Sequence, residues 1–109
     1  MQFIPAIKIS DLPIGAKKPV MVGGKELILL NVDGAIHAVQ RRCPHMGADL
    51  CKAKMEAGLL ICPKHRATFD IVTGEVLARA KLMFMFMKTG PLQTYNTKLD
   101  GGTILVEIE

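Results

Sequence analysis

The chain has 109 residues, of which half are hydrophobic and 22% are charged, and its formal net charge at neutral pH is +4. This length suits one domain with its own core, and the composition excludes a disordered chain. Basic residues are scattered and aromatic residues make up only 5% of the chain, which argues against a nucleic-acid-binding surface. We expect a single domain over residues 1–109.

The sequence contains no stretch suited to crossing a membrane. Its longest apolar run, Leu82–Met87, falls far short of the roughly 20 residues that a transmembrane helix needs. The segment Met1–Ile9 lacks a basic start and is interrupted by Pro5, so it does not resemble a signal peptide. We therefore expect a cytoplasmic protein. In that compartment an odd count of three cysteines favours metal binding, catalysis or packing over a disulfide framework.

Turn-forming residues punctuate the chain and separate short segments with strand character. In chain order, an Asp–Gly pair joins Lys25–Val32 to Ala35–Val39 and predicts a tight hairpin. Met83–Met87 fits either a strand buried on both faces or a hydrophobic docking patch. A second Asp–Gly pair separates Gln93–Lys98 from Thr103–Ile108 and predicts another hairpin. Since no segment keeps a helical period over three turns, we expect an antiparallel all-β sandwich or barrel.

Two segments without strand character, at about 41–55 and 62–68, carry four of the six cysteine and histidine residues. The first reads C-x-H, from Cys43 to His45, and the second reads C-x-x-H, from Cys62 to His65, with sixteen residues between them. Such a donor set suits either a zinc ion or a [2Fe–2S] cluster with two Cys on one iron and two His on the other. Zinc fingers pair Cys with Cys and His with His along the chain, whereas each segment here mixes the two. The spacing therefore favours the cluster and leaves zinc as the alternative.

The sequence resembles the Rieske ferredoxin family. The residues that carry the resemblance are Cys43-Pro44-His45-Met46-Gly47-Ala48-Asp49-Leu50, Cys62-Pro63-Lys64-His65, Phe69-Asp70, Thr73-Gly74-Glu75, Gly90-Pro91-Leu92, Tyr95 and Asp100-Gly101. The resemblance implies an antiparallel β sandwich with a small cluster-binding subdomain and one Rieske-type [2Fe–2S] cluster. It further implies that Cys43 and Cys62 bind the buried iron, and that His45 and His65 bind the outer iron.

The resemblance also assigns a third loop, at about 88–92, whose Gly90 and Pro91 would shield the cluster. Membrane-bound respiratory members of the family tie their two cluster loops together with a disulfide. The cysteines of that disulfide would fall at positions matching Ala48 and Lys64, so this chain is similar to the soluble ferredoxin branch.

Three further positions are candidates for tuning the reduction potential. The respiratory proteins place a serine and a tyrosine hydroxyl against the cluster sulfurs, and the matching residues here are Ala67 and Phe69. Because hydrogen bonds to the sulfurs stabilise the reduced cluster, their absence predicts a low potential, roughly −150 mV or somewhat above. Arg66 stands where many relatives have glycine, and a positive φ there would strain it.

The implied function is that of a one-electron carrier between a reductase and a terminal oxygenase or other redox enzyme, and not of an enzyme by itself. Two alternatives remain: a small Rieske subunit of a larger reductase complex such as nitrite reductase, and a zinc-binding structural module or redox sensor. A monomer is expected, and the basic charge favours redox partners with acidic docking surfaces. Cys51 and His37 lie outside the motifs, and packing is the simpler interpretation of both.

Overall fold

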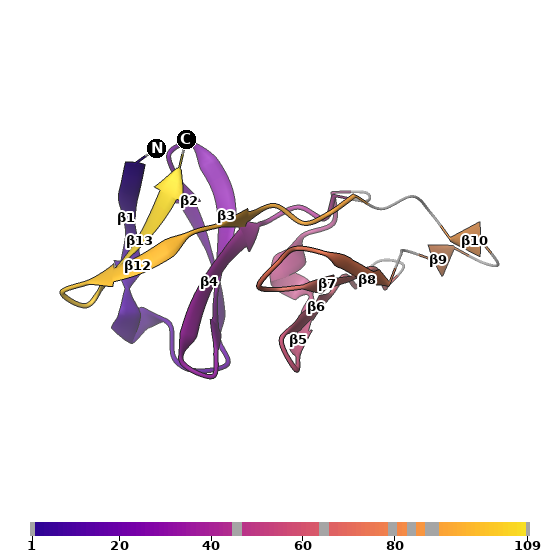
Figure 1. Ribbon diagram of the computed structural model, residues 1–109, viewed down its shortest axis with the longest axis horizontal. Coiled ribbons are helices and arrows are strands. Elements are labelled where there is room, and N and C mark those ends of the chain that lie inside the picture. The colour runs from indigo at the N-terminus through magenta and orange to yellow at the C-terminus, as the bar shows by residue number, and fades with distance from the viewer. Residues whose placement is uncertain are drawn as a thin grey trace.

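The computed structural model describes residues 2–44, 47–63, 66–78, 81–82, 85–86 and 90–108, with only the backbone described at 81–82 and 85–86. Its regular structure is almost entirely antiparallel β-strand, as the sequence predicts (Figure 1). The elements are β1 (Gln2–Lys8), η1 (Ile9–Asp11), β2 (Lys17–Val22), β3 (Lys25–Val32), β4 (Ala35–Gln40), η2 (Leu50–Lys52), β5 (Lys54–Glu56), β6 (Leu59–Ile61), β7 (Thr68–Asp70), β8 (Val76–Ala78), β9 (Lys81–Leu82), β10 (Met85–Phe86), β11 (Thr94–Tyr95), β12 (Thr97–Asp100) and β13 (Thr103–Ile108), where η marks a short 3₁₀ turn.

The strands form two packed sheets at one end of the molecule, and a third sheet lies beside them. One sheet has the order β11-β4-β3-β2, and the second has the order β1-β13-β12. Figure 1 shows these two on the left, with both chain ends, and the sheet β5-β6-β7-β8 to their right. The β9–β10 pair is separate from the other sheets. No helix in the described part of the chain is long and apolar enough to cross a membrane.

The β3–β4 hairpin separates two hydrophobic cores. Because side chains alternate across a strand, Leu27 and Leu29 face one core, whereas Ile28 and Leu30 face the other, and all four are fully buried. The first core lies against β13, and the second lies against the right-hand sheet and the cysteine loops. The predicted hairpin is confirmed, with an Asp–Gly turn whose residues both have positive φ.

The C-terminal hairpin is confirmed, but two strands stand where the sequence predicts its single first strand. The sequence predicts one strand over Gln93–Lys98, whereas the structure breaks it at Asn96 into β11 and β12. The break arises because β11 pairs with β4 in one sheet and β12 pairs with β13 in the other. Met83–Met87 is predicted to be either a strand buried on both faces or a hydrophobic docking patch. The side chains that would distinguish these lie outside the described part of the chain.

The turn after β7 anchors the segment that follows residue 90. The carboxylate of Asp70 accepts hydrogen bonds from the backbone N–H groups of Val72 and Thr73, at 2.8 and 3.1 Å. Gly74 then approaches Leu92 so closely that a Cβ on the glycine would lie 2.1 Å from the Leu92 carbonyl oxygen. The Leu92 N–H donates to the Gly74 carbonyl at 2.8 Å. The Thr73-Gly74 motif thus holds Leu92 in the core beside the cysteine loops.

Replacing Gly74 with alanine should destabilise the protein by roughly 2–4 kcal/mol, since the new methyl group collides with backbone and the φ of +80° disfavours a side chain. Gly58→Ala is the matched control, because Gly58 has a φ of +77° but nothing within 4 Å of the new Cβ. It should cost only about 1 kcal/mol. Thermal unfolding of both variants measures the difference, and equal losses would contradict the steric account.

Candidate metal centre

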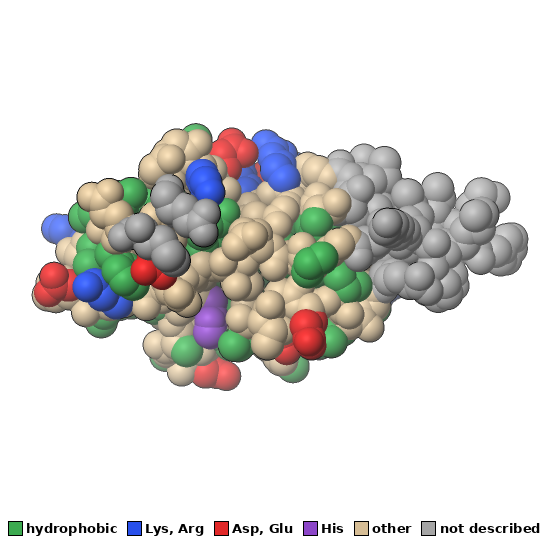
Figure 2. Space-filling view, turned by 45° about the horizontal axis from the view of Figure 1, so that its top comes forward, with side chains coloured by type: hydrophobic (Ala, Val, Ile, Leu, Met, Phe, Trp, Pro, Cys, Tyr) green, Lys and Arg blue, Asp and Glu red, His purple; other side chains and the backbone are tan. Residues whose placement is uncertain are grey.

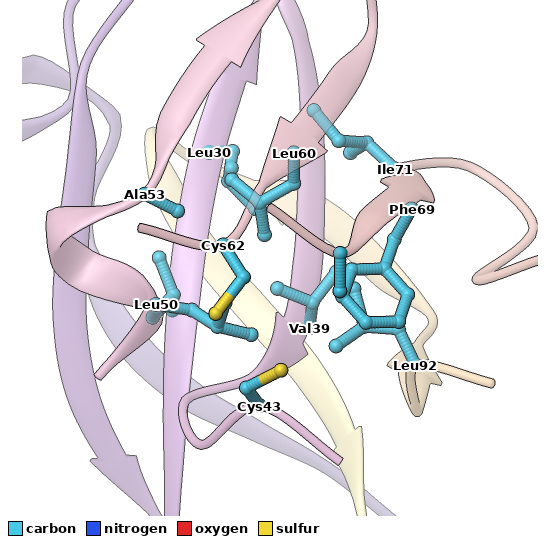
Figure 3. Close-up of a cluster of buried hydrophobic side chains, with 12 residues drawn as sticks. Leu30, Val39, Cys43, Leu50, Ala53, Leu60, Cys62, Phe69, Ile71 and Leu92 are labelled. Carbon is cyan, nitrogen blue, oxygen red and sulfur yellow. The ribbon is translucent and has the colours of Figure 1, made fainter. Parts of the chain in front are cut away.

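Cys43 and Cys62 come together in the core between the β3–β4 hairpin and the β5-β6-β7-β8 sheet. Cys43 is 2% exposed and Cys62 is fully buried. Figure 3 shows the two sulfur atoms turned toward each other among aliphatic and aromatic side chains. Cys43 follows β4 and Cys62 follows β6, so each residue begins a loop that leaves the end of a strand.

The two cysteine loops have the same backbone closure. The Cys43 N–H donates to the carbonyl of Ala48, and the Cys62 N–H donates to the carbonyl of Ala67, both at 2.8 Å and both five residues along the chain. The fourth residue after each cysteine has a left-handed backbone, with φ of +73° at Gly47 and +59° at Arg66. The loops are therefore matched turns, and the strain anticipated for Arg66 is present.

A bidentate ion pair holds the base of the first loop. The Arg41 guanidinium donates to both carboxylate oxygens of Asp49 at 3.1 Å, and the Cys51 N–H donates to the same carboxylate at 3.0 Å. Donation from Arg41, followed by donation from the Cys51 N–H, lowers the pKa of Asp49 to about 2. The backbone closes beneath it, where the Leu50 N–H donates to the Arg41 carbonyl at 2.8 Å.

The third cysteine, Cys51, is not part of the buried Cys43–Cys62 pair. Cys51 lies half-buried in η2 and packs against the edge of the same core, where burial raises the pKa of its thiol. Lys17 in β2 donates to the backbone carbonyls of Cys51 and Ala53, which ties η2 to the sandwich. His37 lies half-buried in β4. Packing therefore accounts for Cys51, and His37 is an ordinary strand residue.

Ala67 and Phe69 are fully buried in the core that contains both cysteines, and neither side chain carries a hydroxyl. Gly90 and Pro91 are exposed and immediately precede the buried Leu92. Two of the four predicted ligands, His45 and His65, lie outside the described residues, as does Lys64. Within the described ranges no three potential metal-ligating side chains gather.

The cysteine pair fits an iron–sulfur cluster. A thiolate in an apolar core is strongly disfavoured unless a metal ion neutralises its charge, and here two cysteine sulfurs face each other in such a core. In a Rieske centre one iron takes two thiolates and the other takes two imidazoles. The Cys/His spacing points to both cysteines, whereas the Arg41–Asp49 pair has no signal in the sequence, because neither residue type by itself marks the base of a loop.

Fold and site define a Rieske-type iron–sulfur protein. A family model for the Rieske [2Fe-2S] domain matches residues 2–91, and the chain belongs to this family. Its cofactor is accordingly one Rieske-type [2Fe–2S] cluster.

Two curated ferredoxins match over most of their length. The chain is 30% identical to the ferredoxin component of the naphthalene 1,2-dioxygenase system of Pseudomonas aeruginosa, over 98% of this chain and 96% of the relative. It is 27% identical to the ferredoxin component of the alkene monooxygenase system of Xanthobacter autotrophicus, over 100% of this chain and 84% of the relative. These relatives are ferredoxins, and this chain is likewise an electron carrier and not a catalytic component.

Solved structures share the fold. The Sphingomonas yanoikuyae B1 ferredoxin aligns with a TM-score of 0.81 at 22% identity, over 99% of this chain and 100% of that one. The ferredoxin of carbazole 1,9a-dioxygenase from Nocardioides aromaticivorans IC177 also aligns with a TM-score of 0.81 at 22% identity, over the full length of both chains. The predicted antiparallel fold with a small cluster-binding subdomain is thereby confirmed.

Arg66→Gly should stabilise the holoprotein by about 1 kcal/mol, because glycine adopts the left-handed backbone without strain. The matched variant Gly47→Ala should destabilise it by a similar amount, since the new Cβ meets nothing within 4 Å and only the φ of +73° opposes it. Chemical unfolding of the two variants gives both values. A less stable Arg66→Gly protein would show that the arginine side chain contributes more than its backbone costs.

The Arg41–Asp49 pair should make stability fall in acid. The folded pKa of Asp49, about 2, lies below its ordinary value of 3.8, so its stabilisation is complete above that value and disappears as pH falls toward 2. Asp49→Asn removes this contribution. The difference in unfolding midpoint between wild type and Asp49→Asn should be constant above about pH 5 and should shrink below pH 4. A difference independent of pH from 6 to 3 would contradict the role of the carboxylate.

Proposed function

We propose that this chain carries single electrons from a reductase to a terminal oxygenase or other redox enzyme, as its oxygenase-associated relatives suggest. The observation that supports this most directly is the pair of buried cysteines at the ends of two matched loops, away from both chain termini. Such an arrangement holds a metal group firmly, and firm ligation keeps the structural rearrangement on electron transfer small.

In this proposal the domain spans 1–109, with cluster-binding loops at about 41–55 and 62–68. Cys43 and Cys62 would hold the inner iron, and His45 and His65 would hold the outer iron. When bound, the cluster accepts and releases one electron. The chain contributes the rest: the apolar core excludes water from the thiolates, and the matched loop closures fix both sulfur positions. Gly90 and Pro91, in the loop at about 88–92, would cover the cluster.

The distribution of charge supports partners with acidic docking surfaces. Residues 41–91 contain nine basic and four acidic side chains, whereas the rest of the chain contains five basic and six acidic ones. The whole net positive charge therefore belongs to the stretch of sequence that contains both cysteine loops. On the face shown in Figure 2, acidic and basic side chains are interspersed over the described surface. A net positive charge favours diffusional encounter with a negatively charged partner.

The same proposal places the protein in the cytoplasm as a monomer that binds no nucleic acid. Its main competitor is a small Rieske subunit of a larger reductase complex such as nitrite reductase. Stable copurification with a large subunit would favour that competitor, whereas a free monomer on gel filtration favours the carrier. A zinc-binding structural module or redox sensor is the remaining alternative, and a colourless protein with stoichiometric zinc would identify it.

A low reduction potential follows from the two buried side chains that lack a hydroxyl. Ala67→Ser should raise the midpoint potential, because a hydroxyl hydrogen bond to a cluster sulfur stabilises the more negative, reduced state. Ala38→Ser is the matched control, since Ala38 is equally buried but lies in the other core. Protein-film voltammetry compares the three proteins. Equal shifts in both variants would remove Ala67 from the set of tuning residues.

The purified protein should take up one electron per chain in an anaerobic dithionite titration, and air should restore the oxidised visible spectrum over repeated cycles. Reduced protein should then reoxidise faster when the oxygenase component of a naphthalene 1,2-dioxygenase system is added. Uptake of no electron, or irreversible bleaching in the first cycle, would contradict the proposed carrier.

A further inference from the structure

A groove with basic walls runs beside the second cysteine loop. Its volume is about 350 Å³, and its cationic side chains are Lys52, Lys54 and Arg66. Ile61 and Pro63 supply apolar surface to the same groove, and Glu56 supplies one carboxylate, so the three cations leave the lining with a net charge of +2. Lys52 ends η2, Lys54 begins β5, and Arg66 belongs to the loop that Cys62 begins, so three separate elements bring positive charge to one place. Figure 1 shows β5 and β6 in the right-hand half of the molecule.

Most other cations near the cysteine loops already have partners. Arg41 pairs with Asp49 and Arg42 pairs with Glu26, at 3.1 and 3.5 Å. In the groove, Lys54 has only a solvent-exposed contact with Glu56 at 3.3 Å, with the two side chains 71% and 60% exposed. Such exposed pairs contribute little and exchange readily for a stronger partner. Among the described residues, neither Lys52 nor Arg66 forms an ion pair.

Arg66 occupies its place at a cost in backbone energy. Its φ of +59° is in the left-handed region, where the matching position of the first loop has Gly47. Glycine at residue 66 would close the loop without that strain. Strained residues tend to be retained where the side chain has a function, and here the strained side chain is a guanidinium lining the groove.

We propose that this groove is the docking site for an acidic segment of the redox partner, with aspartate or glutamate carboxylates paired to Arg66, Lys52 and Lys54. This inference rests on the proposed function, because it takes the partner to be a redox protein. The guanidinium fork of arginine suits carboxylates, since it can donate two parallel hydrogen bonds. Because Cys62 itself lines the groove, a segment bound there lies against the loop that begins with a cluster ligand.

Binding of a hexaglutamate peptide to the holoprotein at low ionic strength tests this directly by isothermal titration calorimetry. Arg66→Asn removes the charge while keeping a residue that tolerates positive φ, and Lys54→Gln removes a second groove charge. Lys18→Gln is the matched control, because it removes one exposed positive charge from β2, outside the groove. We expect Kd to rise roughly threefold or more in each groove variant and to change much less in the control.

Equal losses of affinity in all three variants would mean that the peptide senses only net charge, and would overturn the proposal. Failure of the wild-type holoprotein to bind the peptide would overturn it too. Carbodiimide cross-linking to the same peptide provides a second readout. Lys52 and Lys54 should take most of the cross-links, and an even distribution that includes Lys8 and Lys98 would count against the groove.

Arg66→Gly separates this proposal from the proposed function. The variant should unfold at a higher temperature than wild type and bind hexaglutamate more weakly, and its one-electron uptake is measured alongside. If its affinity is unchanged and electron uptake is intact, the groove proposal fails and the carrier stands. If wild-type protein takes up no electron, the carrier fails whatever the peptide does.

Discussion

Everything else in the structure depends on keeping two cysteine sulfurs together in an apolar core. Cys43 and Cys62 are nineteen residues apart in the sequence and begin different loops, yet both are almost completely buried in one hydrophobic cluster. The β3–β4 hairpin makes this possible, because alternate residues of its buried run serve the sandwich core on one side and the cysteine core on the other. The sandwich therefore acts as a rigid base from which the two loops project. Gly74 and Leu92 close the core from a third direction.

Around that core, the two cysteine loops are held in different ways. The first loop is held by Arg41, Asp49 and an unstrained Gly47, so its charges are used internally. The second has Arg66 in place of glycine, which strains the backbone and places a charge in a groove. The same backbone turn is thus formed by glycine in one loop and by a strained arginine in the other.

The sequence could predict the parts whose signals are local. An Asp–Gly pair between apolar runs predicts the β3–β4 hairpin, which is confirmed, and the mixed Cys/His spacing predicts a Rieske-type cluster, which the family match supports. The break at Asn96 could not be predicted, because it depends on which sheet each half of the strand joins. The role of Gly74 was also hidden, since its close neighbour Leu92 is eighteen residues away along the chain. The sequence predicts strain at Arg66 only if its φ is positive. The sign of φ depends on the loop closure through Ala67, which the sequence does not show.

The most direct test of the central claim is the low-temperature EPR spectrum of the dithionite-reduced protein. Two thiolates on one iron and two imidazoles on the other predict a rhombic signal whose average g value lies well below that of the free electron. The signal should be lost in His45→Ala and in Cys62→Ala, and retained in Cys51→Ala. A wild-type sample that gives no EPR signal and contains stoichiometric zinc would contradict the account. The buried cysteines would then hold a zinc ion, which neither accepts nor donates an electron.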